Sequence, residues 1–152
     1  MEHTRSVSEE TRQVLLEAGW YLGRRIDTER WEADLVADGF PPLHAAARQF
    51  VAEYGGLAFR LSGPGITSAR EPFNLVPTAC LGEADRFIGW SEHLKREIAP
   101  VGEHAVGTNG FAFLGIDDRG EILRVVDWLA TFGRMPYAMD GLVLGYMPRK
   151  IE

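Results

Sequence analysis

The periodic apolar pattern of residues 43–54 constrains the fold of this chain more than any other feature. Apolar side chains recur there at the i, i+3, i+4, i+7 spacing of one helical face, at Leu43, Ala46, Ala47, Phe50, Val51 and Tyr54. Pro41 and Pro42 precede the pattern, and a proline in the first turn of a helix loses no hydrogen bond. The sequence therefore predicts a helix that begins at these prolines and ends at the pair Gly55-Gly56.

This glycine pair could belong either to a phosphate-binding loop or to a corner of the chain. A phosphate-binding loop places its glycines after a strand and before a helix, so that the helix N-terminus faces the anion. Gly55 and Gly56 instead follow a helical pattern and precede the β-type run Leu57–Leu61. The partial negative charge at a helix C-terminus repels phosphate. We therefore interpret Gly55 and Gly56 as a structural corner between a helix and a strand.

Capping signals and periodicity predict further helices around this central one. They run from Ser6-Val7-Ser8-Glu9 to about Ala18, from Asp27 or Thr28 to near Gly39, over Ala84–Ile98, and onward from Pro136. Short β-type runs occupy the middle of the chain, at Leu57–Leu61, Phe73–Val76, Phe111–Ile116 and Glu121–Val126. The composition of Asp117-Asp118-Arg119-Gly120 suits a hairpin turn between the last two runs.

The order of the elements, with helices first, then a meander of strands and then a closing helix, predicts an α+β fold rather than alternating βαβ units. In this fold the N-terminal helices and a C-terminal helix pack on a largely antiparallel sheet. The 152 residues correspond to a single ordinary domain, so we expect one domain over residues 1–152.

The net charge of −6 limits the partners of the chain. Direct nucleic-acid binding requires clustered Lys and Arg, so an acidic protein of this kind more naturally meets a basic protein partner. The single cysteine, Cys80, excludes an internal disulfide and fits a reducing compartment. We see no signal peptide and no apolar run long enough to span a bilayer. We expect a cytoplasmic, monomeric protein without a membrane partner.

Residues suited to catalysis or metal binding are few. His3, His44, His93 and His104 are scattered and lack the spacing of metal ligands. Glu103 and His104 are adjacent, but neighbours on a strand face opposite sides of the sheet. We therefore predict no catalytic, metal-binding or cofactor-binding residue and no cofactor. A small hydrolase built on Glu103, His104 or Cys80 is the least favoured hypothesis, for want of a nucleophile paired with a base.

Residues 27–38 carry five acids, Asp27, Glu29, Glu32, Asp34 and Asp38, against one base, Arg30. Two interpretations stay open. Acidic runs of this kind are usually solvated helix faces, and acids in a first turn complement the helix dipole. Alternatively, the five acids form a surface that matches a basic cleft on a protein partner, where complementary charge speeds association.

The corner also carries a family resemblance. The ordered set Ala46, Phe50, Glu53, Tyr54, Gly55, Gly56 and Leu57 resembles the helix-to-strand signature of the SUKH superfamily of bacterial immunity proteins. Further residues resemble its third subgroup: Leu15 to Arg25, Trp31, Gly39-Phe40, Arg70, Pro72-Phe73, Pro77, a Val101-Gly102-Glu103 turn with Gly107, Gly115-Ile116-Asp117 and Gly120. The resemblance spans about Leu15 to Gly120.

The resemblance implies an α+β fold and a non-catalytic activity. Similar proteins are typically encoded beside a polymorphic toxin and neutralise its toxic domain, often a nuclease, by binding it. The resemblance transfers no contact residue, so the five acids of residues 27–38 are candidates on the ground of charge alone. The alternative function is a regulatory domain that binds a small ligand or a peptide on the same scaffold. A neighbouring gene for a large secreted protein with a variable C-terminal domain would favour immunity.

Overall fold

A computed structural model describes residues 7–152 of the chain. Three helices come first, α1 (Glu9–Ala18), α2 (Glu29–Asp38) and α3 (Ala45–Tyr54). Two short strands, a 3-10 helix and another helix follow, β1 (Ala58–Phe59), β2 (Phe73–Asn74), η2 (Pro77–Cys80) and α4 (Ala84–Leu94). The remaining elements are β3 (Ala99–His104), β4 (Ala112–Ile116), β5 (Glu121–Val125), β6 (Leu129–Arg134), α5 (Tyr137–Leu144) and β7 (Arg149–Lys150).

The strands form one seven-stranded sheet in the order of the sequence, and each strand is antiparallel to its neighbours. The predicted hairpin is confirmed, with β4 and β5 in register from Phe113 opposite Val125 to Ile116 opposite Ile122. The buried Asp117 closes its turn, because Oδ1 accepts hydrogen bonds from two backbone amides of the turn. The α+β prediction is therefore confirmed.

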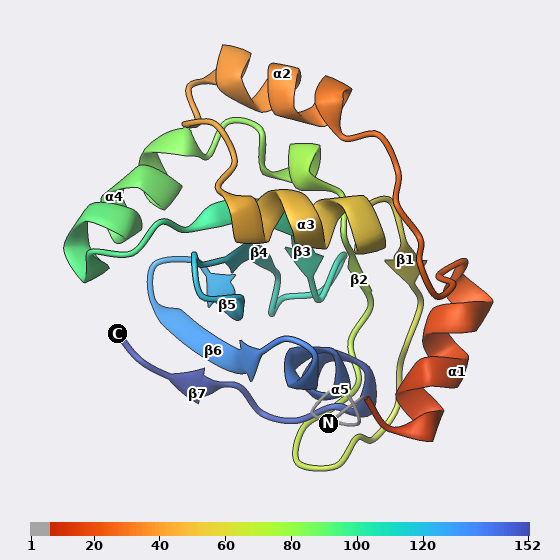
Figure 1. Cartoon of the computed structure of the whole chain (residues 1–152). Coiled ribbons are helices and arrows are strands. Elements are labelled where there is room, and N and C mark those ends of the chain that lie inside the picture. The colour runs from red at the N-terminus through yellow and green to blue at the C-terminus, as the bar shows by residue number, and fades with distance from the viewer. Residues whose placement is uncertain (1–6) are drawn as a thin grey trace.

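Helices cover both faces of the central strands. Successive residues of a strand point to opposite faces, and Ile122 and Leu123 are each fully buried. In Figure 1, α2, α3 and α4 lie above the strands, whereas α5 lies below them beside β6. α1 packs against α5, and the Ser8 amide donates a hydrogen bond to the Asp140 carboxylate (3.1 Å).

Local capping explains where the first two helices end. Gly19 and Gly39 take left-handed conformations at the C-termini of α1 and α2 (φ 112° and 113°), as the sequence predicts. At the start of α1, Ser8 is the N-cap, and its hydroxyl accepts from the Thr11 amide (3.2 Å). The predicted cap Ser6 lies outside the described residues, as does His3.

The predicted start of α3 is wrong by a few residues. Pro41 and Pro42 lie in the extended linker before the helix, and His44 is the N-cap. Its Nδ1 accepts a hydrogen bond from the Ala47 amide (3.1 Å). Since this amide can only donate, the imidazole proton is on Nε2, which donates to the Ile116 carbonyl oxygen (3.1 Å).

Several strand predictions also need correction. Residues 101–103 are not a turn but lie inside β3, which is irregular between Pro100 and Gly102. Only two residues of the run Leu57–Leu61 and two of Phe73–Val76 pair as strands, and α4 ends at Leu94 rather than Ile98. No sequence pattern predicted β6 or β7.

Candidate protein-binding surface

The corner between α3 and β1 is filled by the protein itself. A Cβ on Gly55 would lie 2.4 Å from the Val51 carbonyl oxygen and 2.6 Å from Cζ3 of Trp31. Gly56 takes φ +86°, a conformation that side chains other than glycine disfavour. The ring of Trp31 therefore occupies the space beside the glycine pair.

A guanidinium group satisfies the carboxyl end of α3. Arg24 donates from Nη1 to the Glu53 carbonyl oxygen (2.6 Å) and from Nη2 to that of Gly55 (2.9 Å). The Glu53 carboxylate accepts from Nε1 of Trp20 (3.0 Å). These contacts attach the segment after α1 to α3, so Glu53 serves local structure rather than acid–base chemistry.

The five acids of residues 27–38 do not form one uniform surface. Asp27 accepts a hydrogen bond from the Glu29 amide (2.9 Å) just before α2. Asp38 accepts from the Gly82 amide (2.8 Å), which joins the end of α2 to the start of α4. Asp27, Glu29, Asp34 and Asp38 are all exposed.

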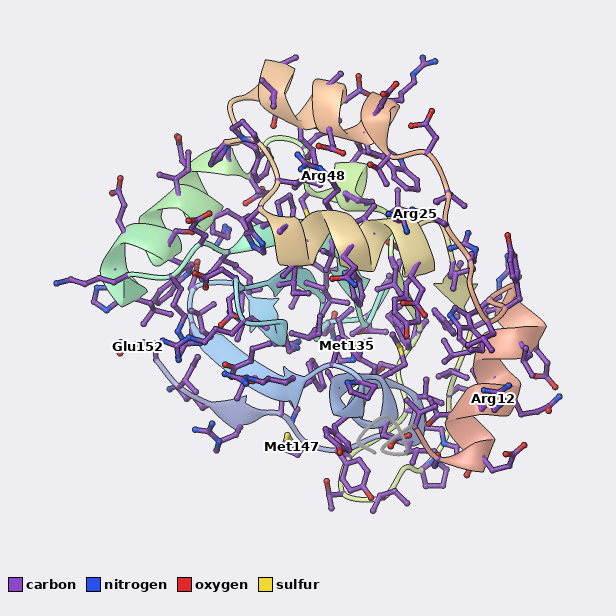
Figure 2. The ribbon with its side chains drawn as sticks, in the orientation of Figure 1. Arg12, Arg25, Arg48, Met135, Met147 and Glu152 are labelled. Atoms are coloured by element: carbon purple, nitrogen blue, oxygen red, sulfur yellow. The ribbon has the colours of Figure 1, made fainter. Side chains whose placement is uncertain are left out.

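Glu32 differs from the other four acids because it is neutralised within the protein. Its carboxylate accepts from Nε and Nη2 of Arg48 (3.1 and 2.9 Å) and from the Thr28 hydroxyl (2.6 Å). The hydrogen bonds from Arg48 hold the pKa of Glu32 below its usual range. Figure 2 places Arg48 between α2 and α3. This pair links the two helices and leaves Glu32 with little free charge for a partner.

The exposed side of α2 also carries apolar surface, which the charge pattern did not predict. Val36 is 49% exposed, and Leu81 is 46% exposed at the end of η2. The hydrogen bond between Asp38 and Gly82 brings these two segments together. Protein-binding surfaces combine an apolar centre with a polar rim. Val36 could have been noticed in the sequence, because it falls beside the helix face defined by the buried Leu35.

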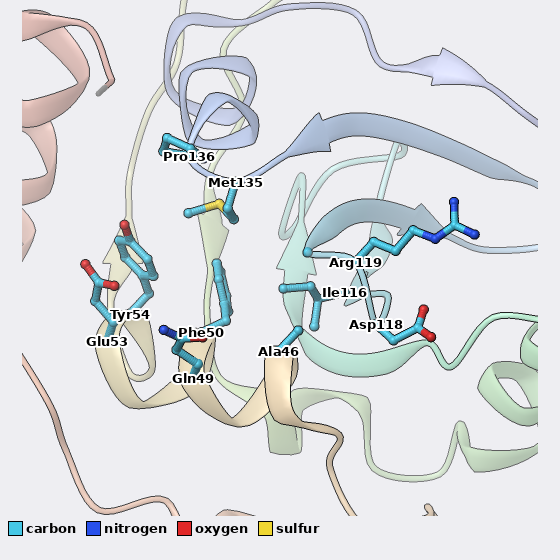
Figure 3. Close-up of a pocket in the computed structure, with 11 residues that line it drawn as sticks. Ala46, Gln49, Phe50, Glu53, Tyr54, Ile116, Asp118, Arg119, Met135 and Pro136 are labelled. Atoms are coloured by element: carbon cyan, nitrogen blue, oxygen red, sulfur yellow. The ribbon is translucent and has the colours of Figure 1, made fainter. Parts of the chain in front are cut away.

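A shallow hollow of about 430 Å³ lies between α3, the β4–β5 turn and the β6–α5 connection (Figure 3). Phe50, Ile116 and Met135 line its middle, whereas Glu53 lies at one end and Arg119 at the other. Burial and the neighbouring Glu53 raise the pKa of Tyr54, so its hydroxyl stays protonated even above pH 10. The hollow could hold an apolar side chain or a small ligand.

Each of the residues considered for catalysis is hydrogen-bonded to a group other than a catalytic partner. Glu103 accepts from Asn74 (2.8 Å), while His104 points to the other face, where it contacts Phe132 and Arg124. Burial and the positive charge of Arg124 lower the pKa of His104 to about 4. Cys80 is fully buried, and burial raises the pKa of its thiol. The described residues contain no group of three or more His, Cys, Asp or Glu side chains that could hold a metal ion.

The molecule is a helix-covered antiparallel meander, and its helix α2 carries exposed acidic and apolar side chains. The SUKH-3 immunity protein family matches residues 7–140, and the chain belongs to this family. No curated protein and no solved structure matches the chain. No helix in residues 7–152 has the length and apolarity needed to cross a bilayer.

Proposed function

We propose that this chain is a non-catalytic immunity protein that binds a cognate bacterial toxin domain and blocks it with one copy per toxin. The observation that carries this proposal is the family match over residues 7–140. The partners of Glu103, His104 and Cys80 agree with a binding role, since Glu103 accepts from Asn74, His104 from Arg124, and the Cys80 thiol donates to the Gly102 carbonyl oxygen rather than to a base. The protein would act as a monomer in the cytoplasm of the cell that carries the toxin gene.

The exposed side of α2 is the proposed contact surface. Asp27, Glu29, Asp34 and Asp38 would face a basic cleft on the toxin, such as the nucleic-acid-binding groove of a nuclease. Glu32 would support this surface through Arg48 rather than touch the toxin. Complementary charge would speed association and disfavour wrong partners. Val36 would supply apolar contact area at the edge of this surface, beside the buried face of α2.

A second candidate is a regulatory domain that binds a small ligand or peptide. The observation that favours it is the hollow beside Phe50, Ile116 and Met135, which is within the size range of small-molecule sites. The hollow is open and shallow, whereas small-molecule sites usually enclose most of their ligand. It therefore ranks second to toxin binding.

Co-expression and pull-down with a candidate toxin test the proposed function. The C-terminal domain encoded by the adjacent gene is expressed in a bacterial host with and without this protein. We expect growth only when both are present, and a stable one-to-one complex in the pull-down. Absence of both rescue and complex would overturn the proposal and direct attention to ligands of the hollow.

A further inference from the structure

A pocket of about 260 Å³ lies between the α2–α3 linker, α4 and the start of β3. In Figure 1 the linker runs beside α4, on the same side of the molecule as the end of α2. The buried apolar walls are formed by Phe40, Phe87 and Ile98. The centroids of the Phe40 and Phe87 rings lie 5.6 Å apart in an edge-to-face arrangement. Pro41 and Pro42 lie on the exposed side of the pocket. The pocket therefore offers a preformed apolar interior next to the proposed contact surface.

The side-chain donors on the pocket wall are already engaged. The Ser91 hydroxyl donates to the Phe87 carbonyl oxygen (2.7 Å) and accepts from the Ile98 amide (3.1 Å). His44 uses both ring nitrogens, on Ala47 and Ile116. The prolines have no N–H group. An anionic group entering the pocket would thus find no side-chain donor on its wall.

Two carboxylates at the pocket have no ion-pair partner among residues 7–152. Glu92 and Glu97 line it, both are exposed, and neither forms an ion pair within residues 7–152. The bases between them in the chain, Lys95 and Arg96, do not line the pocket, and Arg96 pairs with Asp117 and Glu121 (3.3 Å each). The pocket therefore combines apolar walls with carboxylate hydrogen-bond acceptors. This combination favours a side chain that carries a cationic group at the end of an apolar methylene chain.

The volume indicates a single side chain rather than a cofactor, because sites for drug-sized ligands begin at about 300 Å³. Arginine fits best, since its methylene groups match the apolar walls and its guanidinium can donate to two carboxylates at once. We propose that this pocket receives an arginine side chain of the toxin domain, with the guanidinium between Glu92 and Glu97. This inference rests on the proposed function and adds the side chain that anchors the complex.

Neutralising the two carboxylates tests the anchor. In an E92Q/E97Q variant we expect the dissociation constant for the toxin domain to rise roughly thirty-fold, the effect of losing a central hot spot. Most of the change should appear in the dissociation rate, as for desolvated charge pairs. The matched control is E9Q/E17Q, which removes two exposed carboxylates of α1, on another side of the molecule (Figure 1). We expect it to bind as the wild type does.

A small probe tests the pocket without the toxin. Titration of the wild-type protein with n-butylguanidinium should shift the methyl NMR signals of Ile88 and Ile98, which line the pocket. The E92Q/E97Q variant should show at least a several-fold smaller shift, and n-butylsulfonate should shift neither signal.

The outcomes separate the two proposals. Unmoved methyl signals in the wild type, or a wild-type dissociation constant for E92Q/E97Q, would overturn the arginine pocket even where the toxin binds. A wild-type protein that binds n-butylguanidinium but no toxin domain would leave the pocket standing as a guanidinium site and would overturn the proposed function.

Discussion

At the scale of single residues, the packing around Gly55 leaves no room for a side chain. We expect G55A to destabilise the protein by about 1–3 kcal/mol, as overpacked positions do, because the new Cβ would meet the Val51 carbonyl and the Trp31 ring. The matched control is G89A, on the exposed side of α4, where a Cβ would meet nothing within 4 Å. G89A should stabilise by about 0.4–1 kcal/mol, since alanine restricts the unfolded chain. Urea denaturation of both variants measures the difference, and equal midpoints would contradict the role of the corner.

His104 makes stability depend on pH. Its pKa is about 4 in the folded protein, lowered by burial and by Arg124, against an ordinary value of 6.5. The unfolded chain therefore binds a proton between pH 6.5 and 4 that the folded protein does not bind, and stability falls as the pH falls through this window. The loss contributed by this one group is on the order of 2–3 kcal/mol at pH 4.

Replacement by glutamine isolates this effect. In H104Q the free energy of unfolding should change less between pH 7 and pH 4 than in the wild type, because the titrating group is gone. H93Q is the control, since the His93 side chain is 59% exposed. Parallel pH profiles for H104Q and the wild type would show that His104 titrates normally.

At the scale of elements, the guanidinium of Arg24 holds the carboxyl end of α3. The R24A variant loses two hydrogen bonds from a charged donor to the carbonyl oxygens of Glu53 and Gly55. We expect a loss of about 1.5–3 kcal/mol in the free energy of unfolding. R25A removes an exposed neighbour of the same chemistry and should change stability by less than about 0.5 kcal/mol. Thermal unfolding compares the two, and equal melting temperatures would exclude the capping role.

Elements with local signals could be predicted, and elements that depend on distant partners could not. Gly19 and Gly39 end their helices through a backbone conformation that the residue itself permits, so the sequence sufficed. The start of α3 was misplaced because proline is compatible with a first turn and equally with an extended linker. β3 contains Pro100 and Gly102, which weaken a strand signal, and its pairing with β4 sets its limits.

The candidate sites show the same division. The charge of residues 27–38 is visible in the sequence, but the pairing of Glu32 with Arg48 spans sixteen residues and appears only in the fold. The arginine pocket combines residues 40–44, 87–92 and 97–100, three segments that no local pattern connects. No local sequence pattern therefore identifies Glu92 and Glu97 as part of one pocket.

At the scale of the whole molecule, the distribution of charge should set the rate of toxin capture. The net charge is −6, and Glu29 and Asp34 are exposed on the outermost helix of Figure 1. In an E29K/D34K variant we expect association with a basic toxin domain to slow by roughly ten-fold or more at low salt, because electrostatic steering is lost. Glu32 is left unchanged, since its replacement would disturb the contact between α2 and α3.

Association rates measured at several salt concentrations, and compared with a second variant, distinguish electrostatic steering by α2 from an effect of net charge alone. The E9K/E17K variant makes the same change in net charge on α1, which lies apart from α2 (Figure 1). Stopped-flow rates should then fall clearly for E29K/D34K and much less for E9K/E17K. The difference should vanish near 1 M salt, where the Debye length is about 3 Å.

Equal slowing of both variants would mean that the whole acidic molecule, rather than α2, attracts the toxin. A salt-independent difference would instead mean that Glu29 and Asp34 act in the bound complex.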